Sequence, residues 1–367
     1  MNTTVYFGIA VTAILIILGI IFSKSRTVSF GQILWIALLT AGNSGGTDFM
    51  DNMNIYLAAD THQIGGLSVT NGVFSLFATI AREHGMQYIT FNAMVSAVST
   101  ALVALFVFKF AKRPALAFSL ILIFPLIDNV IQKRWYPAMA IVLVALPLLL
   151  DKQHKIRNII MFWFFCLIAV QFHSGALVYL TIPLFLLIPE KLQFKVAVFA
   201  FVGGSLLPSL FPILLKYITI QGMTDKLNLY FTTFAQTASI WHYLFWILWQ
   251  SLQIWLVYIM HKMDSNNLFL NFAWKLNMWS IIFIPLNYFN PVFTRIYRLI
   301  MIINFVAVGN ALKLQDGKKI SLGSIIAFGG EFVMATASFL LMDFLTASSL
   351  GFDILVIPVY VQNIFLN

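Results

Sequence analysis

Two apolar runs of membrane-spanning length, joined by a short basic turn, constrain this chain most. The runs extend from Arg134 to Lys152 and from Arg157 to His173. As α-helices they would measure roughly 27 Å and 24 Å, close to the thickness of a hydrocarbon core. The turn between them carries Lys152, Lys155 and Arg157, so it should face the cytoplasm. Arg134 and His173 would then share the opposite, outer surface of the membrane.

Composition supports the same class. Hydrophobic residues make up 60% of the chain and charged residues 10%, a ratio that no soluble domain of 367 residues tolerates on its surface. The formal net charge of +9 would suggest nucleic-acid binding in a soluble protein. Here the basic residues stand in short clusters between apolar runs, as the positive-inside rule requires. We therefore expect a multi-pass membrane protein that does not bind nucleic acid.

The apolar runs predict an all-α, polytopic transmembrane bundle of about 12 spans. We expect one integral membrane domain over residues 1–367, with the amino terminus outside and outer loops at 43–87 and 219–239. The expected spans cover 5–22, 28–41, 88–108, 115–127, 134–152, 157–173, 176–188, 196–218, 240–260, 268–288, 299–312 and 322–345.

Several segments depart from a plain span. The run 28–41 is short, which suggests that it continues into the polar stretch 42–47 inside a protein-lined, outer-face cavity. In the following loop, apolar residues between Val73 and Ile80 have helical spacing, which predicts an interfacial helix lying on the membrane surface. Lys275 interrupts its run, so either a helix starts near Leu276 after an interfacial lead-in, which we favour, or Lys275 points into a wet cavity. The tail 351–367 is expected to stay outside or to be re-entrant.

A group of basic residues breaks the inward bias of the chain's positive charge. These residues suit a phosphate-bearing ligand, because guanidinium binds phosphate through two donors and stays charged at any relevant pH. The alternative is that they contact anionic lipid headgroups or pair with Asp48, Glu83 and Asp128. The residues expected on the outer side are Arg82, Lys133, Arg134, Arg295 and Arg298.

Other side chains expected on the outer side are also candidates for the functional site. Each of them could instead have a purely structural role. Asp48 follows two glycines and could cap a helix, and a histidine in the position of His173 often only hydrogen-bonds at a helix end. His84 could be a solvated loop residue. The aromatic residues near this surface could stack on sugar rings, although interfacial anchoring is their commoner role. They are Tyr56, Trp135 and Tyr136.

Taken together, these elements resemble the EpsG-like branch of the Wzy-type bacterial polysaccharide polymerases. The resemblance covers most of the chain. Its strongest part is the turn Phe172-His173-Ser174-Gly175-Ala176-Leu177 with the arginine-headed helix at Arg134 before it. Weaker parts are Gly46-Thr47-Asp48 and Arg295-Ile296-Tyr297-Arg298. This chain has Asn43 and Ser44 where the family commonly has an arginine, and Trp135 where a glutamine is common.

Such proteins join lipid-linked oligosaccharide repeat units at the outer face of the bacterial cytoplasmic membrane, with undecaprenyl diphosphate as carrier. The resemblance implies that Arg134, Arg295 and Arg298 clamp the diphosphate. Asp48 and His173 are candidates for the base or for orienting the acceptor, and spacing does not choose between them. Arg82, His84, Lys133, Tyr56 and Tyr136 are further substrate-binding candidates. A chain-length regulator and a flippase are possible partners.

We expect no cofactor. No DxD-like pair lies at the outer face, so arginine rather than a metal ion is expected to neutralise the leaving group. No Walker loop or Rossmann fingerprint is present. Two other function classes stay open at this point: a polysaccharide ligase or sugar O-acyltransferase, and a lipid-linked glycan transporter or flippase. Transport would favour buried charges near the middle of helices, where only Lys275 and Glu331 qualify.

Overall fold

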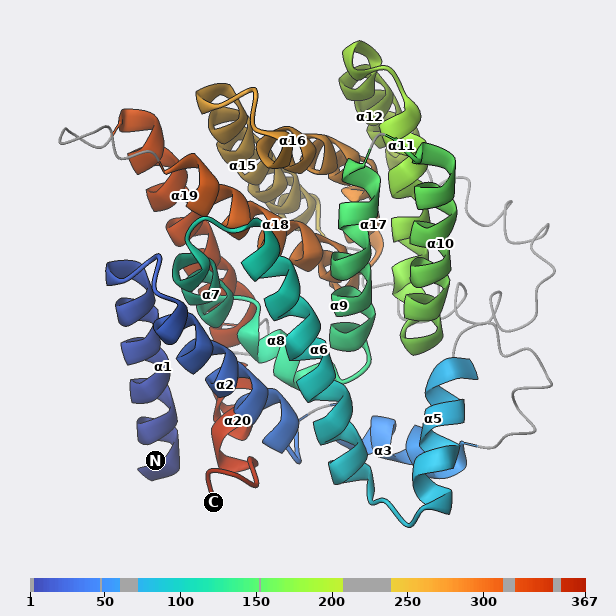
Figure 1. The fold of residues 1–367 in the computed structure, drawn as a ribbon, viewed down its shortest axis with the longest axis vertical. Helices are drawn as coiled ribbons and strands as arrows, with labels where there is room; N and C mark the ends of the chain where they lie inside the picture. The colour runs from blue at the N-terminus through green and yellow to red at the C-terminus, as the bar shows by residue number, and fades with distance from the viewer. Residues whose placement is uncertain are drawn as a thin grey trace. The chain divides into compact units, whose positions relative to one another are not determined.

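The computed structural model describes residues 3–46, 48–59, 72–151, 153–206, 239–312, 321–345 and 351–367, and these residues are predominantly helical (Figure 1). Within them the one extended pairing is an isolated antiparallel bridge between Asn43 and Asn363. The expected all-α class is therefore confirmed. Most of the expected outer loop 219–239 lies outside the described residues.

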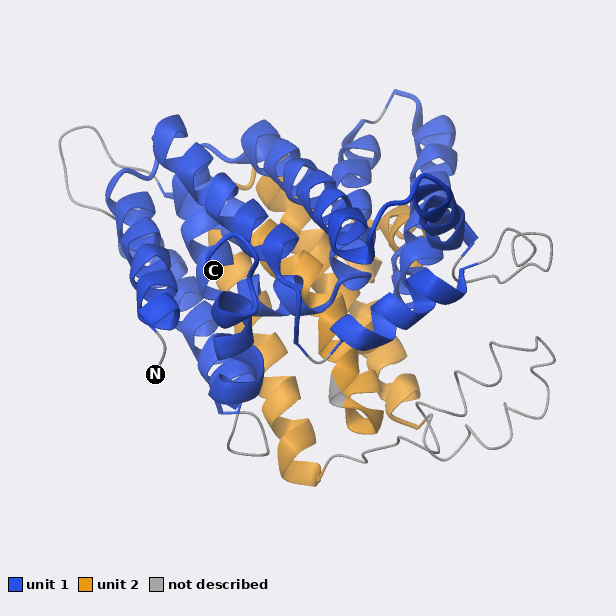
Figure 2. Cartoon of the chain, turned by 90° about the horizontal axis from the view of Figure 1, so that it is seen from below, with its two compact units in different colours: residues 1–180, 305–367 blue, residues 181–304 orange. Residues whose placement is uncertain are grey.

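The chain divides into two compact units. Unit 1 comprises residues 1–180 and 305–367, and unit 2 comprises residues 181–304 (Figure 2). Each unit is described below by itself, and the expectation of a single membrane domain stays a prediction.

Unit 1 contains the helices that carry most of the expected site. They are α1 (Thr3–Ile21), α2 (Arg26–Gly42), α3 (Phe49–Ala58), α5 (Gly72–Glu83), α6 (Tyr88–Phe110), α7 (Pro114–Ile123), α8 (Leu126–Ile131), α9 (Trp135–Ala145), η1 (Leu146–Leu150), α10 (Lys155–Phe172) and most of η2 (Ser174–Thr181). After residue 305 the unit adds the end of α18 (Arg295–Ala311), α19 (Leu322–Ser338), η6 (Phe339–Phe344), η7 (Phe352–Val356) and α20 (Ile357–Val361).

Unit 2 is built from helices of the middle of the chain. They are α11 (Ile182–Leu187), α12 (Glu190–Ser205), α15 (Ile240–Met263), α16 (Leu268–Ser280), η4 (Ile281–Phe283), α17 (Leu286–Phe289), η5 (Pro291–Thr294) and the first part of α18.

Six helices in the described ranges are long and apolar enough to cross a membrane, which supports a multi-pass membrane protein. The expected number of about 12 spans stays a prediction, because the other apolar helices are shorter. The six are Thr3–Ile21, Tyr88–Phe110, Lys155–Phe172, Ile240–Met263, Val292–Ala311 and Leu322–Phe344, and the shorter ones are Pro114–Ile123, Trp135–Leu150, Ser174–Leu187 and Phe352–Val361.

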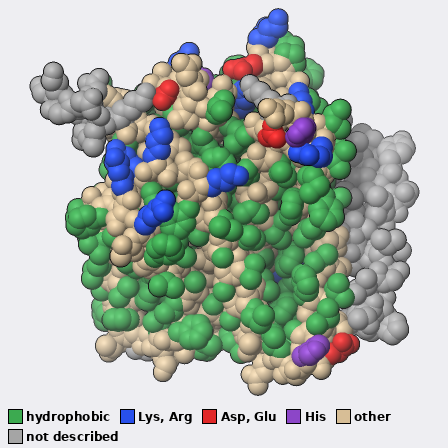
Figure 3. Space-filling model, in the orientation of Figure 1, with side chains coloured by type: hydrophobic (Ala, Val, Ile, Leu, Met, Phe, Trp, Pro, Cys, Tyr) green, Lys and Arg blue, Asp and Glu red, His purple; other side chains and the backbone are tan. Residues whose placement is uncertain are grey.

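The outer surface of these helices has the character expected in lipid. On the face drawn in Figure 3, Lys and Arg side chains gather toward the upper end, and a broad hydrophobic band lies beneath them. Helix α1 shows the reason at residue level, since its buried residues are the stripe Val5, Gly8, Thr12 and Gly19. Small residues let neighbouring helices approach closely where lipid gives no hydrophobic drive for association. The large residues of α1 are therefore left to face the bilayer.

The expected span 115–127 is broken. Helix α7 ends at Ile123, Phe124 is extended, and α8 begins at Leu126. Pro125 explains the break, because it lacks an N–H and disfavours helical geometry in the residue before it. All of α8 is buried, including Asp128 and Asn129. Irregular backbone and polar side chains at membrane depth are tolerated where protein surrounds them.

In unit 2, the expected lead-in before Leu276 is wrong. Helix α16 is continuous from Leu268 to Ser280 and includes Lys275. The Lys275 ammonium lies 3.0 Å from Glu190 Oε2 at the start of α12. An ion pair with an exposed carboxylate keeps this charge out of lipid, so no break in the helix is needed.

The carboxyl-terminal tail is part of unit 1. The Tyr360 hydroxyl lies 3.1 Å from Thr12 Oγ1 of α1, and the Trp35 indole of α2 donates to the same Thr12 oxygen at 2.9 Å. Asn363 donates to the carbonyls of Leu38 and Leu39 in the last turn of α2. The tail thus supplies partners for backbone groups that a helix end leaves unpaired.

We predict that Gly19→Ala destabilises unit 1. A Cβ at this position would lie 2.2 Å from both Gln32 Nε2 and Ser119 Oγ, and 2.6 Å from the Ala115 carbonyl oxygen. Gln32 donates to Ser119 and to the Leu15 carbonyl, so a displacement also breaks buried hydrogen bonds. The expected loss is about 1–3 kcal/mol, measured as a lower melting temperature of the purified protein in detergent.

The matched control is Gly329→Ala in α19, where a Cβ meets no atom within 4 Å. Because alanine favours a helix over glycine, this variant should melt at the same or a higher temperature. Equal melting temperatures for the two variants would contradict the tight packing of α1.

Candidate functional site

The first candidate group lies where α3 and α9 begin. Asp48 is the residue before α3, and its carbonyl oxygen accepts a 2.6 Å hydrogen bond from Asn52 Nδ2 one turn later. Asn52 Oδ1 in turn accepts a 2.8 Å bond from Nε of Arg134, the residue before α9. Tyr88 at the start of α6 interacts electrostatically with both Asp48 and Arg134. The structure thus brings together Asp48 and Arg134, which are far apart in the sequence.

Lys133 is buried beside this group. Its side chain is 5% exposed, and its ammonium donates to the Asn43 carbonyl oxygen at 3.2 Å. Burial lowers the pKa of Lys133 to about 7, while the Asp48 carboxylate opposes that shift. Lys133 is therefore a cation that the fold holds at a cost. We call Asp48, Asn52, Lys133, Arg134 and His173 the polar cluster.

His173 joins the polar cluster from the end of α10. Its ring packs against Trp135 in a T-shaped arrangement with centroids 5.0 Å apart. The backbone N–H of Gly175 donates to His173 Nδ1 at 3.0 Å. Because Nδ1 accepts, the neutral imidazole carries its proton on Nε2. In that form His173 presents a hydrogen-bond donor at Nε2.

The turn after His173 depends on Gly175. A Cβ at Gly175 would lie 2.7 Å from Trp135 Cζ3 and 3.0 Å from His173 Nδ1. Only a residue without a side chain fits between these two rings. Close packing thus explains why a glycine follows His173 and Ser174 in this turn.

Buried acceptor oxygens occur in Asn43, which contacts Lys133 through its backbone, and in two residues shortly before Lys133 in the chain. Asn43 Oδ1, Asn129 Oδ1 and Gln132 Oε1 are buried, and none has a hydrogen-bond partner within the described part of the chain. Leaving such groups unpaired costs about 1–3 kcal/mol each. The fold therefore buries these three oxygens at a cost in stability.

Sequence reasoning missed the residues that hold the glycine turn before Asp48. The Gly46 N–H donates to Gln362 Oε1 at 2.9 Å, and Ser44 N–H donates to the Gln362 carbonyl at 2.7 Å. Gly46 has a φ of +90°, which favours glycine. The signal available in the sequence was the polar pair Gln362-Asn363 in an otherwise apolar tail. For Asn52 it was the helical spacing of four residues from Asp48.

Arg82 and Tyr56 support the helices around the polar cluster. The Arg82 guanidinium donates to the carbonyls of Leu57 and Ala59 at the end of α3. The Tyr56 hydroxyl donates to the Met86 carbonyl at 2.6 Å, and its side chain is 1% exposed. These contacts fix α3 against α5, so the geometry gives both residues a structural role. A direct contact with substrate stays a prediction for each.

The two aromatic residues after Arg134 are core residues. Tyr136 is 2% exposed, and its hydroxyl donates to Thr100 Oγ1 at 3.1 Å. Trp135 is equally buried between His173 and Tyr179. Trp135 packs against His173 of the polar cluster, and stacking on a sugar stays a prediction for both rings.

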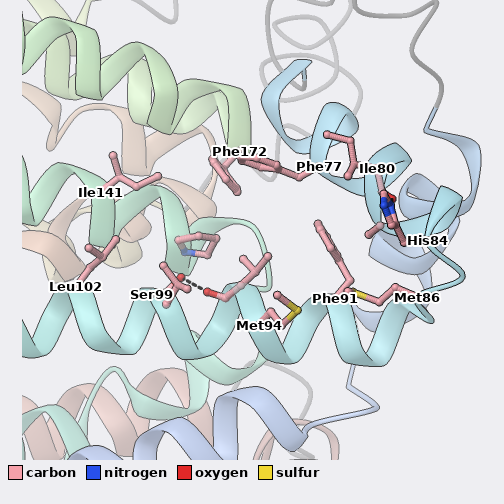
Figure 4. Close-up of a pocket in the computed structure, with 14 residues that line it drawn as sticks. Phe77, Ile80, His84, Met86, Phe91, Met94, Ser99, Leu102, Ile141 and Phe172 are labelled. Carbon is pink, nitrogen blue, oxygen red and sulfur yellow. Dashed lines mark hydrogen bonds between the residues drawn. The ribbon is translucent and has the colours of Figure 1, made fainter.

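His84 lies at one end of an apolar groove of about 560 Å³. Its Nδ1 is 2.8 Å from the Ile80 carbonyl oxygen, so that nitrogen donates. Figure 4 shows the groove between α6 on one side and α5, α9 and α10 on the others, with His84 and Met86 at one end and Leu102 and Ile141 at the other. This groove is apolar and differs from the polar outer cavity expected from the sequence, which stays a prediction.

Arg295 and Arg298 lie one turn apart at the start of α18, in unit 2. Arg298 is 6% exposed, and Arg295 is partly exposed. Their neighbour Tyr297 packs edge-on against Trp249. The polar cluster belongs to unit 1, so a shared clamp with Arg134 stays a prediction. Among the described residues, no group of three or more His, Cys, Asp or Glu side chains is arranged to hold a metal ion.

We predict that Lys133→Met leaves the protein at least as stable at pH 7. Folding lowers the pKa of this lysine from 10.5 to about 7, so the penalty of burying its charge is complete below pH 7. The penalty shrinks as pH rises above 7 and ends only above 10.5, where the lysine is neutral in both states. At about 1.4 kcal/mol per pKa unit, the gain in melting temperature of the methionine variant should be measurable at pH 7 and should fade at pH 10.

Lys109→Met is the control, because this lysine is exposed at the end of α6. It should show no such pH-dependent gain. A Lys133 variant that loses the same stability at both pH values would indicate that the bond to Asn43 serves structure alone.

Comparison with known proteins gives one result. No curated protein matches the chain, and no solved structure matches it. The model of the EpsG family matches residues 27–348, which include the whole polar cluster, both arginines of α18 and the apolar groove. Because the match covers most of the sequence, the chain belongs to the EpsG family.

Proposed function

We propose that this protein is a polysaccharide polymerase that joins undecaprenyl-diphosphate-linked oligosaccharide repeat units at the outer face of the bacterial cytoplasmic membrane. Family membership suggests a polysaccharide polymerase-type membrane protein. The observation that carries the finer proposal is the polar cluster, in which Asp48 interacts electrostatically with Lys133, Asn52 links Asp48 to Arg134, and His173 packs against Trp135, the residue after Arg134.

The chemistry requires two kinds of group, and the polar cluster has both. In the transfer, an acceptor sugar hydroxyl attacks the anomeric carbon of the donor, and the bond from that carbon to the lipid diphosphate breaks. The Asp48 carboxylate accepts the hydroxyl proton. Arg134 holds the leaving diphosphate through charge-assisted hydrogen bonds, and its Nε bond to Asn52 sets its orientation.

His173 and Lys133 complete this assignment. His173 donates from Nε2, because Nδ1 is occupied by the Gly175 N–H. A donor beside Arg134 serves the diphosphate oxygens. Lys133 adds positive charge below Asp48 and lowers the cost of charge on the departing group. The guanidinium and ammonium groups supply this positive charge without a metal ion.

The distribution of charge supports the proposed outer location. The end of unit 1 where α6 begins at Tyr88, here called the Tyr88 end, carries the polar cluster. The opposite ends of α1, α6 and α7 carry Lys24, Arg26, Lys109, Lys112 and Arg113. Basic residues favour the cytoplasmic side, so the Tyr88 end faces outward.

Arg134→Ala should abolish polymerisation without loss of the protein from the membrane. Removing a preorganised charge from a leaving-group site costs about 100-fold or more in rate. In cells lacking the native protein, the variant should leave single lipid-linked repeat units, seen as the loss of the glycan ladder on a sizing gel. His173→Ala should give the same result.

Arg157→Ala is the matched control, because Arg157 is an exposed arginine at the opposite end of α10. This variant should restore the ladder. An unchanged ladder in cells without the protein would overturn the polymerase. A ladder of normal length that is not attached to its final acceptor would indicate a ligase.

Sidedness has its own test. Cys166 is 0% exposed and gives no background, so a cysteine at Glu83 near the Tyr88 end should react with an impermeant maleimide in intact cells. A cysteine at Lys109, at the far end of α6, should react only after permeabilisation. The reverse pattern would place the polar cluster in the cytoplasm and remove the proposed substrate.

A flippase is the second candidate, and buried acidic residues favour it. Glu331 in α19 and Asp343 in η6 are 0% and 1% exposed within one candidate span. Ionisable residues at such depth often line transport pathways. In that case, lipid-linked units would accumulate on the cytoplasmic side of cells that lack the protein. The polymerase leaves them on the outer side.

A further inference from the structure

Unit 1 contains an apolar groove that the chemistry described so far does not use. It is bounded by α5, α6, α9 and α10, and nearly all of its lining is hydrophobic, with His84 and Ser99 as the polar exceptions (Figure 4). Its volume of about 560 Å³ is within the range of small-molecule sites. The Ser99 hydroxyl donates a hydrogen bond to the Val95 carbonyl oxygen at 2.6 Å. A ligand in the groove therefore needs no acceptor for this hydroxyl.

The groove is open to the side. Phe77, Met94 and Val98 line it and are 48%, 56% and 60% exposed, so in a bilayer they face lipid. Along α6 the lining runs from Phe91 to Leu102, roughly 17 Å at 1.5 Å per residue. That length is about half of a hydrocarbon core, and it starts near the Tyr88 end. The groove therefore has the depth of a single leaflet.

Two residues that line the groove are close neighbours of the polar cluster along α9 and α10. Pro137, which lines it, lies one turn after Arg134 on α9. Phe172, which lines it from α10, directly precedes His173. A molecule that fills the groove thus ends beside a guanidinium and an imidazole. The chemistry that fits is a long hydrocarbon chain with an anionic group at its end.

We propose that this groove binds the first isoprene units of a polyprenyl diphosphate, which enter sideways from the outer leaflet between α5 and α6. The inference rests on the proposed function for the identity of the headgroup. Aromatic and methionine side chains form much of the wall, and their polarisable surfaces adapt to a methyl-branched, unsaturated chain. Helix α5, whose apolar residues face the groove, forms its outer wall.

The test is photocrosslinking of the purified protein with a polyprenyl monophosphate that carries a diazirine near its phosphate end. Label should map by mass spectrometry to peptides of the four helices that bound the groove, α5, α6, α9 and α10. Val98→Trp fills the groove and should reduce labelling about tenfold, the change expected for losing about 1.4 kcal/mol of apolar contact. The control is Leu105→Trp, since Leu105 is on the same helix, is 63% exposed and does not line the groove.

Two further arms separate the possible sources of a chain. An excess of dioleoyl phosphatidylglycerol, which has linear chains and a similar charge, should not compete with the probe, and inorganic phosphate should not compete either. Label confined to peptides outside α5, α6, α9 and α10, equal labelling of Val98→Trp and Leu105→Trp, or full competition by phosphatidylglycerol would overturn the groove proposal.

The assay also keeps the two proposals apart, because it needs no sugar transfer. If labelling is normal but the glycan ladder is unchanged in cells without the protein, the groove proposal stands and the polymerase proposal fails. If the ladder is lost but labelling is unspecific, the polymerase proposal stands and the groove proposal fails.

Discussion

The break between α7 and α8 is the feature on which the rest of unit 1 depends. A full-length span here would carry Lys133 and Arg134 to the membrane surface, where water would solvate them. Pro125 shortens the helix, so α8 and the turn after it stay enclosed by protein. Charges in that position need partners from other segments, and these come from Asn43 after α2 and from Asn52 in α3. The polar cluster is therefore a consequence of a helix that stops early.

The carboxyl-terminal tail makes this arrangement possible. The glycine turn before Asp48 has few side chains with which to hold itself, and its backbone groups bond to Gln362. Asn363 caps the end of α2, and Tyr360 packs where α1 has Gly8, whose absent Cβ would lie 2.1 Å from the ring. The first and last segments of the chain thus fix the position of Asp48. Its carboxylate owes its place to contacts far from it in the sequence.

The sequence was sufficient for what depends on local pattern. Apolar run length predicted α1, α6, α10 and α15 closely, and the helical spacing from Val73 to Ile80 predicted α5. Basic clusters and the His173 turn pointed to the polar cluster. What depends on distant partners was missed: the Asn52 bridge, the Gln362 contacts, and the Glu190 carboxylate that lets α16 continue through Lys275. Whether an arginine binds substrate or caps a helix, as Arg82 does, is likewise decided by its neighbours in space.

The unpaired polar atoms and the groove have one explanation in common. A buried lysine and three amide oxygens without donors lower the stability of unit 1, and a groove left to face lipid gains nothing from burial. In the complex that we propose, one amphipathic molecule fills the two sites together and removes both costs. Because α9 and α10 carry residues of both, a chain seated against Pro137 and Phe172 would restrict where its headgroup meets Arg134 and His173. Apolar contact far from the reacting bond would then orient the leaving group, so that binding energy contributes to positioning.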